Sequence, residues 1–199
     1  WDYQQVPYVD AWGREESTGT LPMRAFNNFL NPAYTSSMNV TDVDAEVQRL
    51  YDQTGDSGVV PERPGRYVIV DGARKDLSGQ EYVQYATQRG QSQYEMLEGM
   101  LDNPAYQGLS DADKAAVVAD VYSYADATAK ASVSGYQPDG WVARVAESGA
   151  DPAGYILYRH SGAQEGQTLP EQVQALEEAG ITGEAQARLL LAENPTWAD

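Results

Sequence analysis

Residues 77–134 read LSGQEYVQYATQRGQSQYEMLEGMLDNPAYQGLSDADKAAVVADVYSYADATAKASVS, and this stretch decides the fold class. It carries two helix-start signals, Ser78 with Glu81 and Ser110 with Asp113. A cap hydroxyl and a carboxylate three residues later satisfy backbone N–H groups that a helix leaves unpaired. Apolar residues then recur at the three- and four-residue spacing of one helix face. The stretch therefore predicts long helices, interrupted by the Asn103-Pro104 pair.

The first of these helices contains an interior glycine. The apolar pattern that includes Tyr82 and Tyr85 is interrupted at Gly90 and resumes at Tyr94. Glycine inside a helix is less favourable than alanine by about 1 kcal/mol. We therefore expect a break or a change of direction at Gly90, whereas the second helix should run without interruption to about Val133.

A β signal precedes the helical stretch. The apolar run Tyr67 to Val70 is followed by the turn pair Asp71-Gly72 and by a polar return segment that ends at Leu77. This combination is the strongest hairpin signal that a short sequence offers. We expect a hairpin over 67–77 as the only β element. Either Val68 and its strand face or Tyr67 and its face must rest on the helices, because an isolated hairpin is marginal in water.

Shorter helices are expected on both sides. Thr41 precedes acidic residues that suit the positive end of a helix, and this helix should end near 53–55. We expect a single short helix within 23–30. After Gly135 the pattern predicts four short helices, the last two of them forming a helical hairpin. They cover about 138–147, 152–158, 170–179 and the segment from 183 to Leu191.

The opening of the chain is rich in aromatic residues without helical or strand rhythm. Trp1, Tyr3, Val6, Tyr8 and Trp12 are too many large apolar groups to leave in water. We expect an extended arm that lies across the helical body or across a neighbouring chain. Because the first residue is not methionine, we also expect the chain to be a piece of a longer protein.

Composition and pattern together give the fold class. The chain has 199 residues, of which 42% are apolar, enough for one compact core. We predict a mainly α, irregular multi-helix bundle of about eight helices, with one small hairpin and the aromatic arm. Its parts are an arm with a short helix over 1–40, a helical core with the hairpin over 41–134, and a short-helix part over 135–199.

The chain is strongly acidic and contains no cysteine. Its 30 acidic and 13 basic residues give a formal charge of −17, which repels phosphate backbones and anionic membranes. We expect no direct nucleic-acid partner. No apolar run approaches the roughly 18 residues that span a bilayer, and disulfides and thiolate metal sites are excluded.

Several of these segments carry a resemblance to known proteins. PYVDAWGR at 7–14, TDVDAEVQRLYDQTGDSGVVP at 41–61, the hairpin, the stretch 77–130 and the closing PTW resemble the C-terminal region of large proteins from phages and prophages of gut Firmicutes. They are similar to large polyvalent, virion-ejected or tape-measure-like proteins. The resemblance implies location in a virion or in the bacterial host cytoplasm, and carries over no active-site residue. Similar sequences have a segment like a calcium loop at 158–168, but here the alternating carboxylates are missing.

Each candidate for chemistry also has a structural interpretation. His160 is the only histidine, and a general-base role would require an acidic partner and a nucleophile. Acidic residues at helix starts could form a glycosidase pair or could serve as caps; they are Asp42, Asp44, Glu46, Asp111 and Asp113. The residues around Gly55 faintly resemble a cation loop, in which Asp52, Asp56 and Ser57 would take part. We favour the structural interpretation in all three cases and expect neither a metal nor a cofactor.

Tyrosine is the over-used residue type, with 14 copies against two phenylalanines. Tyrosine offers apolar area with a polar tip, which suits half-wet packing and binding surfaces alike. Packing is the preferred interpretation, and a candidate interaction surface is formed by Trp1, Tyr3, Tyr8, Trp12, Tyr82, Tyr85 and Tyr94.

Three functions follow from these features. The leading hypothesis is a non-enzymatic structural module that contacts its parent polypeptide, a virion component or a copy of itself. An acidic inhibitor or nucleic-acid mimic directed at a host protein is the second hypothesis, and it requires carboxylates gathered on one face. A cell-wall-directed hydrolase is the third, and it requires two carboxylates that face each other in a pocket.

Overall fold

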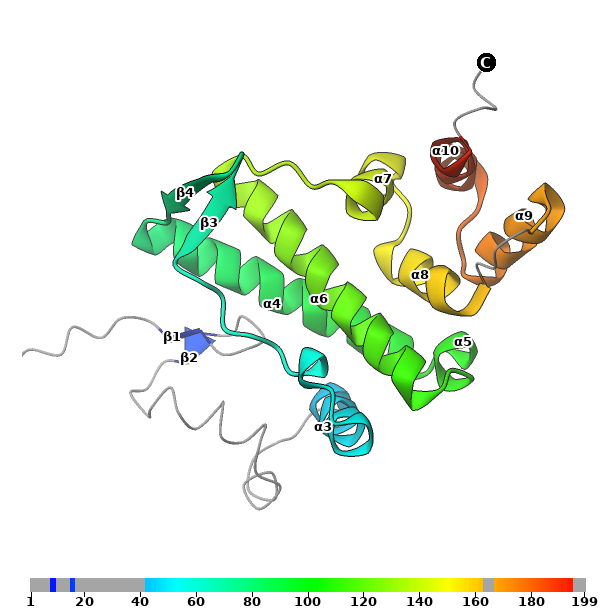
Figure 1. Ribbon diagram of the computed structural model, residues 1–199, viewed down its shortest axis with the longest axis horizontal. Helices are drawn as coiled ribbons and strands as arrows, with labels where there is room; N and C mark the ends of the chain where they lie inside the picture. Colours follow the sequence, from blue (N-terminus) through cyan, green and yellow to red (C-terminus); the bar gives the residue numbers. More distant parts are fainter. Residues whose placement is uncertain (1–7, 10–14, 17–41, 163–166, 195–199) are drawn as a thin grey trace, which may run out of the picture.

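The computed structural model describes residues 8–9, 15–16, 42–162 and 167–194 (Figure 1). Within this part, eight α-helices and one small antiparallel hairpin confirm the mainly α fold class. The predicted short helix within 23–30 and most of the predicted arm lie outside the described residues. The helices are α3 (Asp42–Thr54), α4 (Gly79–Leu101), α5 (Pro104–Gln107), α6 (Asp111–Ser134), α7 (Gly140–Ser148), α8 (Pro152–Leu157), α9 (Leu169–Glu178) and α10 (Gly183–Glu193).

The two longest helices, α4 and α6, form an antiparallel pair at the centre of the molecule (Figure 1). Both begin as the sequence predicts. The backbone N–H of Glu81 donates to Ser78 Oγ, and its carboxylate accepts from the backbone N–H of Ser78 at 2.8 Å. The backbone N–H of Asp113 likewise donates to Ser110 Oγ at 3.2 Å. At the other end, Gly135 adopts a φ of 77°, which closes α6.

The predicted break at Gly90 is wrong. Helix α4 is continuous from Gly79 to Leu101, and Gly90 lies on its buried side. Tyr85 and Met96 from the same side are buried too, so the packing of a long apolar face offsets the cost of about 1 kcal/mol that glycine imposes on a helix. A weak local preference is thus overridden by tertiary contact.

A polar cluster ties α4 to α6. Asp126 of α6 accepts a hydrogen bond from the Tyr85 hydroxyl at 2.5 Å and forms ion pairs with Arg89 at 3.2 Å and with Lys130 at 2.5 Å. Arg89 is only 7% exposed, and its Nη1 donates to the carbonyl of Glu62. Burial and the adjacent Asp126 carboxylate raise the pKa of Tyr85 above its ordinary value. The cluster therefore joins both helices to the segment that leads into the hairpin.

The hairpin appears as predicted, with β3 (Tyr67–Val70) paired to β4 (Ala73–Asp76). Asp71 and Gly72 both adopt positive φ, as a two-residue turn of this kind requires. Val68 is 1% exposed and is the side chain that rests on the helices. Lys75 Nζ reaches the Val133 carbonyl at the end of α6.

The hairpin is not the only β element, so that expectation is wrong. A two-residue pair, β1 (Tyr8–Val9) with β2 (Glu15–Glu16), lies in the predicted arm, and β1 lies against α4. Strands this short carry no alternating pattern that a sequence could reveal. The structure also adds two short helical turns that the sequence did not predict, η1 (Ser57–Val59) and the π-helix η2 (Tyr158–Gly162).

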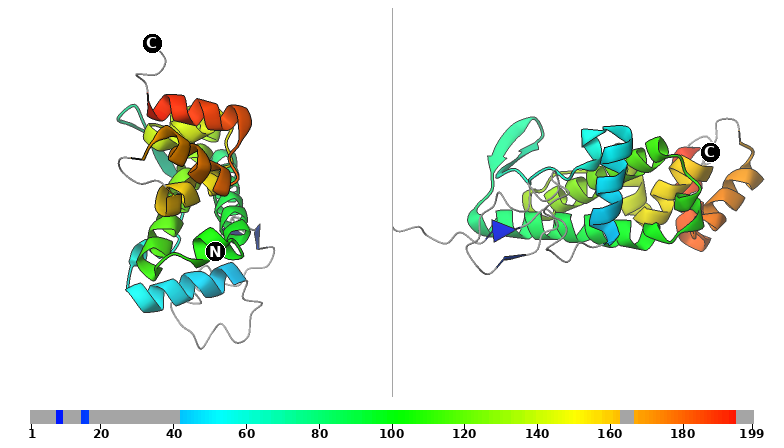
Figure 2. Two further views of the ribbon diagram at one scale, coloured as in Figure 1. Left: turned by 90° about the vertical axis from the view of Figure 1, so that its right-hand side faces the viewer. Right: turned by 90° about the horizontal axis from the view of Figure 1, so that it is seen from below.

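The apolar side chains form two cores. Figure 2 shows the helices that contribute to them from two further sides. The central core lies among α3, α4, α6 and α8, and the C-terminal core lies among α7, α8, α9 and α10. Tyr124 and Trp141 pack against both, and Trp141 stacks between Tyr124 and Tyr155 with ring centroids 6.1 and 6.3 Å away. This aromatic stack connects α7 and α8 to α6, and Tyr155 also belongs to the core that contains residues of α9 and α10.

Replacing Leu50 by alanine tests the central core. Leu50 is fully buried in α3, so the Leu50→Ala variant should lower the free energy of unfolding by about 2–5 kcal/mol. Urea denaturation followed by circular dichroism measures this difference. Leu191→Ala is the control, because Leu191 is 46% exposed; an equal loss in both variants would contradict the assignment of the core.

Two glycines make a second test. A Cβ on Gly154 of α8 would lie 2.5 Å from the Ala179 carbonyl oxygen at the end of α9, whereas a Cβ on the exposed Gly99 of α4 meets nothing within 4 Å. Gly154→Ala should destabilise by about 1–3 kcal/mol through the clash. Gly99→Ala should stabilise by up to about 1 kcal/mol through helix propensity. Thermal unfolding of both variants should shift in opposite directions, and shifts of the same sign would refute the close approach of α8 and α9.

Candidate functional site

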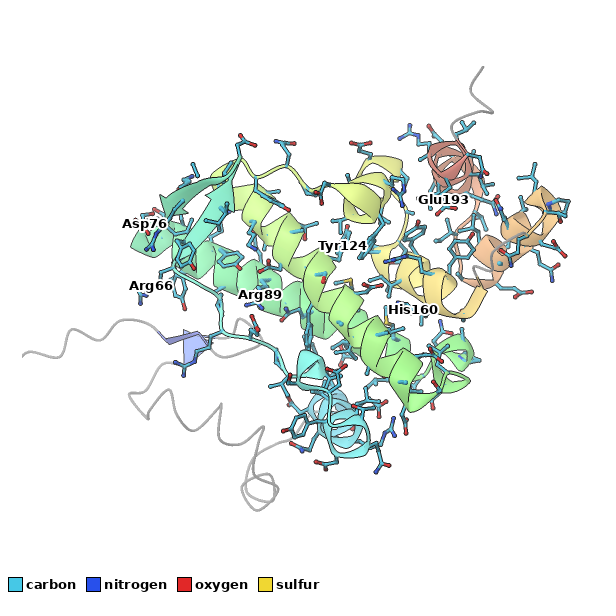
Figure 3. All side chains as sticks on the ribbon, in the orientation of Figure 1. Arg66, Asp76, Arg89, Tyr124, His160 and Glu193 are labelled. Carbon is cyan, nitrogen blue, oxygen red and sulfur yellow. The ribbon has the colours of Figure 1, made fainter. Side chains whose placement is uncertain are left out.

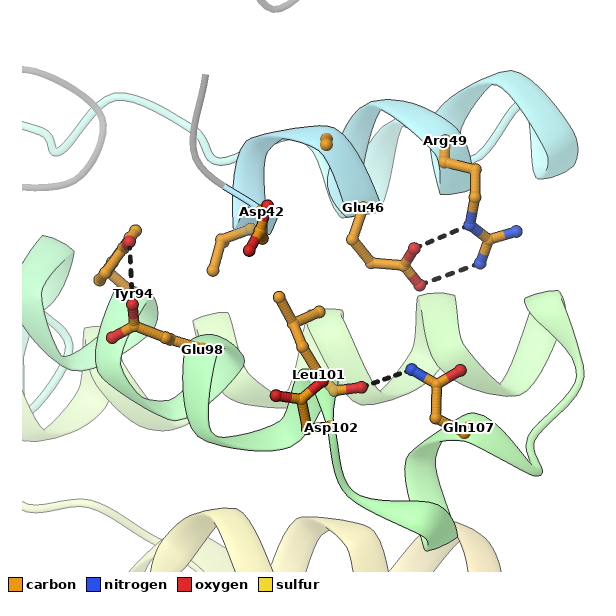
Figure 4. Close-up of a pocket in the computed structure, with 10 residues that line it drawn as sticks. Asp42, Glu46, Arg49, Tyr94, Glu98, Leu101, Asp102 and Gln107 are labelled. Atoms are coloured by element: carbon orange, nitrogen blue, oxygen red, sulfur yellow. Dashed lines mark hydrogen bonds and ion pairs between the residues drawn. The ribbon is translucent and has the colours of Figure 1, made fainter. Parts of the chain in front are cut away.

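An acidic groove of about 750 Å³ lies between α3 and the C-terminal half of α4 (Figure 4). Arg49 stands at one end, and Tyr94 donates to Glu98 at 3.2 Å at the other. Four carboxylates line the groove, those of Asp42, Glu46, Glu98 and Asp102.

Glu46, the most enclosed of these carboxylates, is engaged in structural bonds. Arg49 donates to both of its oxygens, at 2.7 and 2.9 Å, and the Tyr106 hydroxyl donates at 2.9 Å. Burial pushes the pKa of Glu46 upward, but the hydrogen bonds from Arg49 and Tyr106 and the charges of Arg49 and Lys114 outweigh it, so the pKa lies below the ordinary value. A carboxyl group in this state is ionised at neutral pH and cannot serve as a proton donor there.

The other predicted acidic candidates are also occupied as caps or ion pairs. Asp111 accepts from Arg49 Nη1 at 2.8 Å, and Asp113 accepts from the Ser110 hydroxyl at 2.6 Å. Asp56, from the suggested cation loop, caps η1 by accepting from the backbone N–H of Gly58. Asp42 and Asp44 lie in the first turn of α3, as expected for dipole partners. Within residues 42–162 and 167–194, no three potential ligands gather as a metal site would require.

His160 has an acidic partner that the sequence did not reveal. Its Nε2 lies 2.8 Å from Asp120 Oδ2, and Arg159 Nη1 donates to the same oxygen at 2.8 Å. Asp120 stands 40 residues earlier, on α6, so only the fold brings the two together. Figure 3 labels His160, which belongs to η2, an element in contact with α6. The hydroxyl of Ser161 donates to the Leu157 carbonyl instead of to the imidazole. None of the described hydroxyls is bonded to His160, so what the structure shows of this pair is a link between η2 and α6.

Four of the 14 tyrosines are buried and use their hydroxyls to join one element to another. Tyr85 donates to Asp126, Tyr106 to Glu46, Tyr155 to Glu193 at 2.5 Å, and Tyr122 to the Val59 carbonyl at 2.8 Å. Each ring is buried in a core while its hydroxyl reaches an acceptor on another element. For these four residues, the preferred packing interpretation agrees with the structure.

The candidate interaction surface changes accordingly. Tyr85 is 3% exposed, so its inclusion in an exposed surface is wrong. Tyr82 and Tyr94 are half-buried, and the Arg66 guanidinium covers the Tyr82 ring at 4.8 Å. Tyr8 lies in β1, and Trp1, Tyr3 and Trp12 lie outside the described residues.

The outer face of the hairpin is a surface that sequence reasoning left undecided. Tyr67 and Ile69 are 46% and 49% exposed, and Val68 between them is buried. The Arg74 guanidinium lies 4.2 Å from the centre of the Tyr67 ring and also pairs with Asp76. Side chains alternate between the two faces of a strand, so the sequence could not tell which face of β3 packs on the helices. The burial of Val68 shows that the face with Tyr67 and Ile69 points to solvent.

The chain matches no known protein family, no curated protein and no solved structure in the three comparisons made. None of the helices in the described ranges combines the length and the apolar character that crossing a bilayer demands.

Glu46→Gln tests the structural role of the enclosed carboxylate. Because the folded-state pKa of Glu46 is lowered, its ionised form stabilises the fold above the ordinary value of 4.5, and this contribution is lost as the pH falls through the lowered pKa. At pH 7 the variant should lose about 1–3 kcal/mol of unfolding free energy. The difference from wild type should shrink as the pH falls below 4.5.

Urea titrations at several pH values measure this profile, and Glu184→Gln is the control. Glu184 also pairs with an arginine, but its side chain is 78% exposed, so its loss should have no measurable effect. A difference for Glu46→Gln that grows toward acid pH would contradict the assigned ion pairs.

Proposed function

We propose that this chain is a non-enzymatic protein-interaction module of a phage or prophage protein, and that it contacts its partner through the outer face of the β3–β4 hairpin. The observation that carries the proposal is the joint exposure of Tyr67 and Ile69 on one face of the hairpin. Large apolar side chains exposed side by side, rimmed by charged groups, are typical of protein-binding surfaces.

The composition of this face supports the same conclusion. Tyrosine and arginine are among the residue types enriched at interface hot spots, and here Arg74 lies over the Tyr67 ring. The ring is held in place before any partner arrives, which lowers the entropy cost of binding. The hairpin also stands at one end of the helical pair, where a partner can reach it (Figure 1).

The bonds made by the polar candidate residues give indirect support to a non-enzymatic role. Glu46 and His160 are engaged in bonds that hold elements together, since Glu46 accepts from Tyr106 of α5 and His160 pairs with Asp120 of α6. The resemblance to virion-ejected or tape-measure-like proteins adds a setting in which a folded segment serves to dock. The acidic groove favours the inhibitor hypothesis as a second candidate, because it gathers four carboxylates around one hollow.

Affinity capture with matched variants tests the proposal. The full chain serves as bait in lysate from induced or infected host cells, beside Ile69→Asp and Leu191→Asp. Ile69 and Leu191 have similar exposure, 49% and 46%, but lie on different surfaces. A discrete protein should be retained by wild type and Leu191→Asp, and its yield should fall about tenfold or more with Ile69→Asp.

Two outcomes would count against the proposal. Retention of the same protein by both variants would remove the hairpin face from the interaction, and a variant lacking residues 1–12 would then show whether the predicted arm makes the contact. Failure of the wild-type chain to retain any specific protein would remove the support for an interaction module.

A further inference from the structure

The β3 strand presents an open hydrogen-bonding edge on the same residues that expose apolar side chains. In the hairpin register, Val70 pairs with Ala73 next to the two-residue turn and Val68 pairs with Lys75. In such a ladder the intervening residues direct their N–H and C=O groups outward. These residues are Tyr67 and Ile69, and no hydrogen bond to their outward groups occurs within the described ranges.

The two edges of the hairpin differ in chemistry. The β4 edge carries Arg74, Lys75 and Asp76, and charged residues of this kind protect an edge strand against pairing. The β3 edge reads Tyr-Val-Ile-Val and has no charged residue. An additional strand would therefore add along β3 rather than along β4.

Charge indicates what the added strand carries. Residues 62–76, the hairpin and the segment before it, hold four basic and three acidic residues in a chain whose formal charge is −17. Arg74 pairs with Asp76, and Lys75 pairs with Glu81. Arg66, directly before β3, is exposed; its guanidinium lies over the Tyr82 ring and forms no ion pair with a described residue. Arg66 is therefore placed to form an ion pair with an acidic side chain at the end of a docked strand.

We propose that β3 binds an extended, acidic segment of a partner protein as a third strand of the sheet. The inference rests on the proposed interaction function and specifies its partner. Alternating N–H and C=O groups on the edge fit a peptide backbone, which offers both donors and acceptors at the same spacing. A nucleic-acid backbone offers phosphate acceptors and cannot pair with the outward carbonyls, so the edge favours peptide.

The test uses the full isotope-labelled chain and a synthetic probe, the capped heptapeptide Glu-Val-Thr-Val-Thr-Val-Glu. The amide signals of Tyr67 and Ile69 should shift on titration as their N–H groups gain partners, whereas those of Arg74 and Asp76 should not. The same peptide with lysine at both ends should bind more weakly. Arg66→Gln should weaken the binding of the acidic peptide by about two- to fivefold, as for an exposed ion pair, and should leave the lysine peptide unaffected.

Four results would overturn the inference. They are the absence of shifts at Tyr67 and Ile69, equal binding of both peptides, equal shifts with a single-stranded oligonucleotide, and a peptide-independent dimer of the chain that forms through β3. Each leaves the capture experiment standing, since loss of a partner with Ile69→Asp requires only that the hairpin face is the contact surface. If capture also fails with the wild-type chain, the proposed function fails with it.

Discussion

The packing of α4 against α6 is the contact on which the rest of the structure depends. Both helices direct a long buried face at each other, and Asp126 joins them through Tyr85 and Arg89. The hairpin rests on the end of this pair through Val68, α3 closes one side through Leu50, and α8 attaches the C-terminal helices. No other helix in the described ranges is as long as α4 or α6.

In this acidic chain, several carboxylates accept hydrogen bonds that link one helix to another. Glu46 connects α3 to α5, Asp126 connects α6 to α4, Asp120 connects α6 to η2, and Glu193 connects α10 to α8. In three of these four connections the donor is a tyrosine hydroxyl, and in the fourth it is Arg159. A ring that fills a core and a hydroxyl that reaches a carboxylate perform two tasks with one side chain, which phenylalanine could not do.

Local signals in the sequence were sufficient for the helices and the hairpin, because caps, turns and periodicity act within a few residues. Ser78 and Asp71-Gly72 illustrate this. The prediction at Gly90 was wrong because the helix-propensity cost of about 1 kcal/mol is smaller than the free energy gained by burying a long helix face. The partners of His160 and Tyr85 could not be predicted, since Asp120 and Asp126 lie about 40 residues away in the sequence. The sequence did not determine which face of β3 is exposed, and the burial of Val68 in the structure shows that it is the face with Tyr67 and Ile69.

Native-state hydrogen exchange is the most direct test of the central role of the α4–α6 pair. The amides of the buried faces of α4 and α6, such as those of Met96 and Val121, should exchange last and together, with a free energy equal to that of global unfolding. The amides of α9 and α10 should exchange earlier, by local opening. If α9 and α10 remain protected while α4 or α6 exchanges by local opening, the pair is not the frame of the fold and the account given above is wrong.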